Sequence, residues 1–273
     1  MLQTLPRHQR AQGELRVTVG LRDGRTVLRD LRQQGCMKAR FPHPIDAHET
    51  VTLNTSGGVT GGDHLETHLH VEPGASALFA SQAAERFYRA LPANTPAHIR
   101  TTLTIGAGAT AEWLPQETIL FEACAATRTL EIDIAQDASV LGLEALVFGR
   151  TAMGETLHAA RLNDTIRIRR AGRLILHDAI RLDGPADVLN ATSSANANRA
   201  TATIFHVAPD AESRLDALRA AWEHAPAETG ASAWNNMLIA RILAQDAAAL
   251  RATITMGLNQ LRDGRPLPRV WMC

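Results

Sequence analysis

Three carboxylates stand out because they lie in apolar or glycine-rich segments. Glu144 interrupts the apolar run LGLEALVFG at 141–149, Glu117 lies among large apolar residues in WLPQETILFE at 113–122, and Asp63 ends a glycine-rich segment. A carboxylate in apolar surroundings is costly unless it is paired, hydrated or bound to a metal ion. These three side chains are therefore candidate functional residues, although Glu117 can also serve to hold a strained turn.

The glycine-rich segment NTSGGVTGGD at 54–63 carries two Gly-Gly pairs, which require positive φ angles or a close backbone approach. A phosphate-binding loop would need Gly-Lys-Ser/Thr, and a dinucleotide fingerprint would need another glycine spacing and a following helix. We favour a tight, irregular turn between strands and keep direct ligand contact as the alternative. Asp63 could orient this turn by accepting hydrogen bonds from backbone N–H groups.

Histidines occupy one face of the alternating segment 64–71, where His64, His68 and His70 share their side with Glu66. Imidazoles at His-x-His spacing on a strand can chelate nickel or zinc. A polar strand face turned to solvent is the simpler interpretation, so the three histidines are weak metal candidates.

Signals for nucleophilic or zinc-dependent catalysis are missing from the sequence. It has neither a Gly-x-Ser-x-Gly elbow nor a His-Glu-x-x-His motif. Its three cysteines, Cys36, Cys124 and Cys273, are far apart and form no Cys-x-x-Cys pair. Neither a disulfide framework nor a thiolate zinc site is expected, and a reducing cytoplasm is the simplest setting.

The composition is that of a soluble globular protein. The 273 residues carry 28 basic and 28 acidic side chains, so the formal net charge is zero. This balance argues against a nucleic-acid or anionic-membrane surface that depends on net charge. Residues 1–13 are polar, and no apolar run approaches the length that a bilayer demands, so neither a secretory signal nor a membrane span is expected.

The first two-thirds of the chain has the alternation typical of β-strands. Leu15, Val17 and Val19 share one face, and Leu65 and Leu69 repeat the pattern. Further strands are expected near residues 51–53, 75–80, 99–105, 109–114, 128–134, 139–147, 165–169, 174–181 and 201–207. This spacing indicates an all-β sandwich or solenoid.

A weak internal repeat favours stacked β layers. The segments VEPGASA, IGAGATA and IAQDASV begin at residues 71, 105 and 134, and each ends one strand, turns on Gly or Asp, and starts the next strand with small residues. Coincidence in an alanine-rich chain is the open alternative.

The last third changes to helical periodicity. Asp210 can cap a helix that runs to about His224, and Asp246 can start another with Leu250, Ile254, Leu258 and Leu261 on one stripe. We therefore expect a mainly β fold in a single domain, 1–273. Its layered, solenoid-like or sandwich-like body spans about 14–207, and a helical C-terminal part spans about 210–273. The four tryptophans are expected in the core, and an exposed one would indicate a partner-binding face.

Five segments together resemble the urease accessory protein UreD, also called UreH. They are NTSGGVTGGD at 54–63, SQAAERFYR at 81–89, WLPQETILFE at 113–122, LGLEALVFGRTAMGE at 141–155 and GRPLPRVW at 264–271. They occur in the family's order and extend over almost the whole chain, whereas the histidine-rich strand is not part of the pattern.

The resemblance implies a cytoplasmic, non-catalytic chaperone with a layered β body and C-terminal helices. Proteins of this family bind UreF, which recruits the nickel-carrying GTPase UreG, and the assembly docks on apo-urease to promote nickel insertion. No nucleic-acid or membrane partner and no permanently bound cofactor is implied; nickel(II) is present only in transit. The helical end should meet UreF, and Arg251, Arg262 and the exposed side of the last helix are candidates for that contact.

A nickel ion in transit must neither escape nor be trapped, which calls for an internal hydrated passage with several weak oxygen or imidazole contacts. Asp63, Glu117 and Glu144 are our candidates for lining it. Two other hypotheses stay open. A hydrolase on a β-solenoid could use Glu117 and Glu144 as an acid/base pair, and a structural adaptor would have no metal role.

Overall fold

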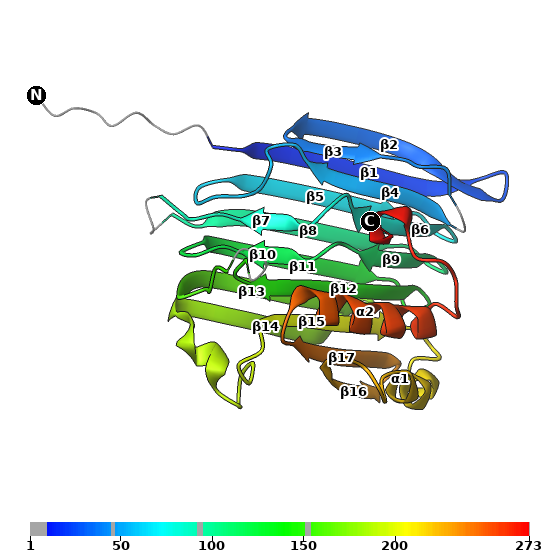
Figure 1. Ribbon diagram of the computed structural model, residues 1–273. Helices are drawn as coiled ribbons and strands as arrows, with labels where there is room; N and C mark the ends of the chain where they lie inside the picture. Colours follow the sequence, from blue (N-terminus) through cyan, green and yellow to red (C-terminus); the bar gives the residue numbers. More distant parts are fainter. Residues whose placement is uncertain (1–9, 45–46, 92–94, 151–153, 273) are drawn as a thin grey trace, which may run out of the picture.

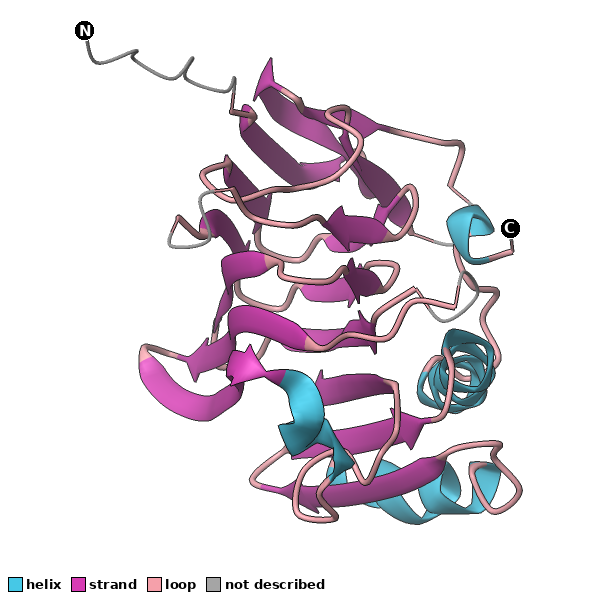
Figure 2. Cartoon of the chain, turned by 60° about the vertical axis from the view of Figure 1, so that its left-hand side comes forward, coloured by secondary structure: helices cyan, strands magenta, loops and turns pink. Residues whose placement is uncertain are grey.

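The computed structural model describes residues 10–44, 47–91, 95–150 and 154–272. Two β-sheets face each other, and helices cover the outside of one of them (Figures 1 and 2). The first sheet contains, in spatial order, β14 (Arg173–Pro185), β13 (Ala159–Arg170), β11 (Ala125–Ile134), β8 (Ala97–Ile105), β5 (His64–Val71), β1 (Gln12–Arg22) and β2 (Arg25–Gly35).

The second sheet contains β16 (Glu228–Trp234), β17 (Met237–Ala244), β15 (Ala200–Val207), β12 (Ser139–Phe148), β9 (Thr110–Leu114), β6 (Ser76–Ser81), β4 (His48–Asn54) and β3 (Met37–Arg40). Two short strands, β7 (Glu85–Phe87) and β10 (Thr118–Leu120), pair beside the end of β12. The expectation of a mainly β fold is confirmed.

The middle of the chain winds as a solenoid, because successive strands alternate between the two sheets and neighbours within each sheet are parallel. In the first sheet β5, β8, β11 and β13 are parallel, and in the second sheet β4, β6, β9 and β12 are parallel. The predicted repeat marks the turns between the sheets. The N–H of Gly106 donates to the carbonyl of Val71 at 2.8 Å, and that of Ala135 to Ile105 at 2.9 Å. The three repeat segments therefore stack directly on one another.

Apolar side chains fill two separate layers. Leu15, Val17 and Val19 point between the sheets, as the alternation predicts, and are at most 1% exposed. The second layer lies between the outer face of the second sheet and the helices, and its buried cluster includes Leu143, Ile204 and Leu258. The strands β6, β9 and β12 thus separate two cores, and a charged side chain buried on them needs a partner.

The last helix forms as predicted. In α2 (Ala247–Leu261), the Asp246 carboxylate accepts a hydrogen bond from the N–H of Ala249 at 2.8 Å, and the stripe from Leu250 to Leu261 is buried. The first helix is shorter than expected. Asp210 does not cap it but pairs with Arg214 at 2.5 Å, a 3-10 turn follows, and α1 covers Leu215–Ala221 only. The strands β16 and β17, which sequence reasoning missed, lie between the two helices and complete the second sheet.

Gly142 offers a test of the inter-sheet packing. A Cβ atom at Gly142 would lie 2.2 Å from the Phe205 ring on the neighbouring strand, whereas a Cβ at Gly230 meets nothing within 4 Å. We expect Gly142→Ala to lower the free energy of unfolding by about 1–3 kcal/mol through overpacking. Gly230→Ala should change it by less than about 0.5 kcal/mol. Urea denaturation measures both, and equal effects of the two variants would contradict this packing.

Candidate functional site

A stripe of polar side chains crosses the otherwise apolar space between the two sheets. We call it the polar stripe. Its members come from both sheets and from the short strands at the side, and they are Asn54, Glu85, Thr118, Arg128, Glu144, Asp164, Asp178, Thr203 and Arg241.

Strand register aligns the stripe. On the second sheet Glu144, Thr203 and Arg241 are direct neighbours across β12, β15 and β17. On the first sheet Arg128 of β11 is opposite Asp164 of β13. Because side chains alternate between the faces of a strand, residues in register on one face of a sheet form a continuous row.

Arg128 lies at the centre of the stripe and links the two sheets. Its Nε and Nη2 donate to the two oxygens of Asp164 at 2.9 and 2.5 Å, and its Nη1 lies 2.8 Å from Oε2 of Glu144. Nη1 also donates to Oγ1 of Thr118 at 2.8 Å. Burial by itself would lower the pKa of this guanidinium, but the carboxylates of Asp164 and Glu144 outweigh burial and raise it. The group is a permanent buried cation.

Glu144 is paired, as its position in an apolar strand required. Oε1 accepts a hydrogen bond from Nε1 of Trp113 at 2.9 Å, and Oε2 meets Arg128. Burial raises the pKa of Glu144, Arg128 and Trp113 oppose this shift, and the nearby Asp164 adds to it. Arg128 is the largest influence that opposes this rise, so removal of Arg128 would favour protonation of Glu144 or the uptake of another cation.

One end of the stripe lies beside the glycine-rich loop. Glu85 on β7 is in register with Thr118 on β10, and its carboxylate accepts hydrogen bonds from Asn54 Nδ2 and the N–H of Arg86, both at 3.1 Å. Burial raises the pKa of Glu85. A pocket of about 180 Å³, lined by Asn54, Gly58 and Glu85 among others, opens here.

At the other end Asp178 accepts hydrogen bonds from Arg241 Nη2 at 2.5 Å and from Thr203 Oγ1 at 3.3 Å. A cavity of about 10 Å³, enough for one water molecule, is lined by Glu144, Asp164, Asp178 and Thr203 among others. It shares Ile180 and Thr201 with a larger surface pocket of about 470 Å³, whose lining includes Arg241. The stripe thus has a pocket near each end.

Acidic groups outnumber basic ones along the stripe. Four carboxylates, Glu85, Glu144, Asp164 and Asp178, face two guanidinium groups, those of Arg128 and Arg241. Such an excess favours cations, and oxygen donors of this type hold divalent metal ions weakly unless they form a complete cage.

Asp63 holds the backbone through both oxygens of its side chain. It is 3% exposed, and its two oxygens accept hydrogen bonds from the N–H groups of Ala11 and Thr60, both at 2.8 Å. The prediction that Asp63 orients the glycine-rich loop is confirmed. The loop itself is a tight turn against Tyr88, because a Cβ at Gly58 would lie 2.3 Å from that ring.

Glu117 lies beside the stripe, not in line with Glu144. Its backbone carbonyl accepts from the N–H of Glu85 at 3.0 Å, but its carboxylate is 3.7 Å from Arg251 on α2. Glu117 and Glu144 therefore face different guanidinium groups, which does not favour their use as an acid/base pair.

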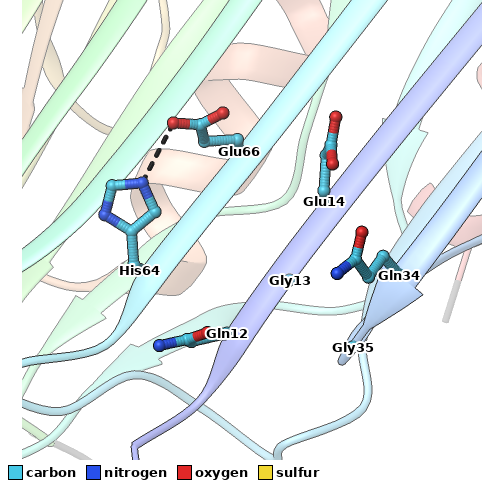
Figure 3. Close-up of a pocket in the computed structure, with 7 residues that line it drawn as sticks. All are labelled: Gln12, Gly13, Glu14, Gln34, Gly35, His64 and Glu66. Carbon is cyan, nitrogen blue, oxygen red and sulfur yellow. Dashed lines mark hydrogen bonds and ion pairs between the residues drawn. The ribbon is translucent and has the colours of Figure 1, made fainter.

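The three histidines lie on the outer face of β5. His64 Nε2 is 2.9 Å and His68 Nε2 is 3.5 Å from the Glu66 carboxylate. His64 and Glu66 line a pocket of about 440 Å³ together with residues of β1 and β2. Figure 3 shows these side chains and the contact between His64 and Glu66. Within the described residues, no group of three or more His, Cys, Asp or Glu side chains is arranged to hold a metal ion.

The two arginines proposed for partner binding are both engaged internally. Arg251 donates to Gln116 Oε1 at 2.8 Å and to the carbonyl of Trp271 at 2.9 Å. The expectation that Arg262 lies on an exposed helix face is wrong. Arg262 is the C-cap residue of α2, is 1% exposed, and donates to Glu112 at 2.7 Å and to the carbonyl of Arg265 at 2.8 Å.

Sequence reasoning found Glu144 but missed the partners that surround it. Glu85, flanked by Arg86 and Arg89 in the segment 81–89, was expected to belong to a structural ion-pair cluster. A sequence signal for burial was present at four of these partners, Arg128, Asp164, Asp178 and Arg241. Each occurs in phase with the buried apolar residues of its own strand, as Arg128 does with Leu130 and Ile132.

Comparison with known proteins gives one consistent result. The family model described as UreD urease accessory protein matches residues 11–272. A urease accessory protein UreD of Azorhizobium caulinodans is 44% identical over 269 residues, covering 97% of this chain and 98% of the relative. UreD proteins of Dinoroseobacter shibae and Rhizobium leguminosarum bv. viciae are 45% and 40% identical, with 97% of this chain and 94% and 96% of the relatives covered. Among the described residues, no helix combines the length and apolar character needed to cross a bilayer.

Arg128 should be essential for the stability of the site. Arg128→Met leaves Glu144 and Asp164 buried without their cation, so we expect the free energy of unfolding at pH 7.5 to fall by about 3–5 kcal/mol. The matched control is Arg100→Met, which breaks an ion pair with Glu131 from a side chain that is 57% exposed and should cost no more than about 1 kcal/mol. Denaturant titration compares the two, and similar losses would contradict the central role of Arg128.

Proposed function

The chain belongs to the UreD family of urease accessory proteins, and from this premise we propose that it is a non-catalytic maturation chaperone that assists nickel insertion into apo-urease in the cytoplasm. It would act in a complex with UreF and, through UreF, with the GTPase UreG. A role in urease maturation follows from family membership.

We further propose that nickel(II) travels along the polar stripe as cargo. The observation that carries this proposal is the row of four inward-facing carboxylates against two guanidinium groups, with a pocket near each end. Carboxylate and hydroxyl oxygens bind divalent ions without the closed thiolate or imidazole cage that would retain them. Glu144 was predicted from the sequence to line the passage, and it lies in the polar stripe. The other carboxylates that we propose for the passage are Glu85, Asp164 and Asp178, in place of Asp63 and Glu117.

Trp234 supports a partner-binding face at the helical end. Trp113, Trp222 and Trp271 are buried, but Trp234 on the edge strand β16 is 43% exposed. The neighbouring helix α1 packs against β16. A large exposed aromatic residue at a sheet edge is a frequent energetic centre of protein interfaces. We propose that this face, together with the exposed side of α2, contacts UreF.

Conversion of Glu144 to glutamine tests the passage. Glu144→Gln removes a negative charge from the stripe while it keeps the side-chain shape and an acceptor for Trp113. We expect urease activation at limiting nickel to fall by about tenfold, with partial recovery at excess nickel, since a weaker cation contact raises the barrier to transfer. The measurement is urease activity after activation of apo-urease in a deletion strain that carries the variant.

The control for this experiment is Glu131→Gln. Glu131 also pairs with arginines, Arg100 and Arg167, but lies on the outer face of the first sheet. Its removal should leave activation unchanged. Normal activation by Glu144→Gln, with normal complex formation, would refute a passage through the stripe.

Substitution of Trp234 tests the UreF face. We expect Trp234→Ala to raise the Kd for UreF by about tenfold or more, because truncation of a central aromatic contact leaves a void in the interface. Leu21→Ala is the matched control, since Leu21 is 45% exposed at the β1–β2 hairpin. Titration of UreF into each variant gives the Kd, and equal affinities for wild type and Trp234→Ala would rule out this face.

A further inference from the structure

Arg128 occupies the oxygens that a cation in the stripe would need. Both oxygens of Asp164 accept from its guanidinium, one oxygen of Glu144 pairs with it, and the other accepts from Trp113. The two central carboxylates therefore have their near contacts filled by groups of the protein. A divalent ion that arrives beside Arg128 meets like charge as well as occupied ligands.

We propose that Arg128 is a latch, a resident cation that keeps Glu144 and Asp164 closed to divalent metal ions until its guanidinium moves away. This inference rests on the proposed function and adds a control point to it. The carboxylates exchange one cation for another, so the charge of the interior stays balanced while the metal ion passes.

The surroundings of Arg128 fit such an exchange. Every contact of its guanidinium named above is to a side chain, namely Asp164, Glu144 and Thr118, and side chains can change rotamer without unfolding the sheets. The two carboxylate partners of Arg128, Glu144 and Asp164, line the cavity of about 10 Å³ together with Asp178 and Thr203 among others. With the guanidinium displaced, these oxygens of the hard type that nickel(II) accepts would surround one small space.

The test is nickel binding by the full-length chain with Arg128→Met. In isothermal titration calorimetry with NiCl₂ as the probe, we expect this variant to bind at least about tenfold more tightly than wild type. Arg128→Met/Glu144→Gln/Asp164→Asn should lose the gain. Nickel should also raise the Tm of Arg128→Met and leave that of wild type unchanged, because only the variant has an uncompensated site.

The matched control is Arg262→Met, which removes a buried arginine from Glu112 on the outer face of the second sheet, where Arg265 still pairs with that carboxylate. It should not gain nickel affinity. If Arg128→Met folds only when nickel is present, recovery of a cooperative melt on adding NiCl₂ supports the latch. Arg128→Lys is the second variant. A lysine ammonium lacks the two-pronged contact with Asp164, so we expect a nickel affinity between those of wild type and Arg128→Met.

The latch is overturned if Arg128→Lys and Arg128→Met, the latter with or without nickel-dependent folding, bind nickel no more tightly than wild type. That outcome is separate from failure of the passage, which appears as normal urease activation by Glu144→Gln. A passage without a latch would give impaired activation by Glu144→Gln and no gain in nickel affinity on loss of Arg128.

Discussion

The cost of removing charge from water governs the interior of this protein. An ion transferred into an apolar core loses several kcal/mol of hydration energy unless a counter-ion and hydrogen bonds replace it. The chain places Glu144, Asp164 and Arg128 in that environment and meets the cost by packing them against each other. Apolar residues of similar volume at these positions would fill the same space without the cost of desolvating charges. Stability alone therefore does not explain the polar stripe, and a function is the better explanation.

The solenoid arrangement makes such a stripe possible. In parallel stacking, residues at equivalent positions of successive coils fall into register, so a few substitutions build a continuous polar row through the core. The same arrangement places the three turns that begin near residues 71, 105 and 134 on one edge. The antiparallel strands β15 and β17 extend the row by direct register of Glu144, Thr203 and Arg241. A regular backbone thus carries an irregular chemical feature without distortion of the sheets.

Much of this fold follows from local sequence. Alternation located β1 and β5, and Asp246 with its apolar stripe located α2, because these features depend only on neighbours in the chain. The strands β16 and β17 were missed because they lie between two helices, in a part of the chain where helical periodicity was expected throughout. The cap at Asp210 was wrong because a nearby arginine, Arg214, competes for its carboxylate. Such competition depends on tertiary contacts that local patterns do not contain.

The burial of single charged residues of the site could be predicted from the sequence, but the contacts between them could not. A charged residue that shares its face of a strand with apolar residues is predicted to be buried. This signal applies to Arg128 on β11 and to Asp178 on β14 as much as to Glu144. What the sequence does not contain is the pairing, since Arg128 and Asp164 are 36 residues apart and meet only through strand register. The error on Arg262 has the same origin, because its partner Glu112 lies 150 positions away.

Arg128 and Arg262 each pair with a carboxylate of the second sheet, Glu144 on its inner face and Glu112 on its outer face, with different consequences. Arg262 is held by Glu112 and by backbone carbonyls of the turn that follows α2, groups fixed by the fold itself. Arg128 is held by carboxylates and a hydroxyl on rotatable side chains. The first arrangement fixes the C-terminal segment to the body. The second satisfies the same electrostatic requirement with partners that another cation can replace, so it is the arrangement suited to a path for metal ions.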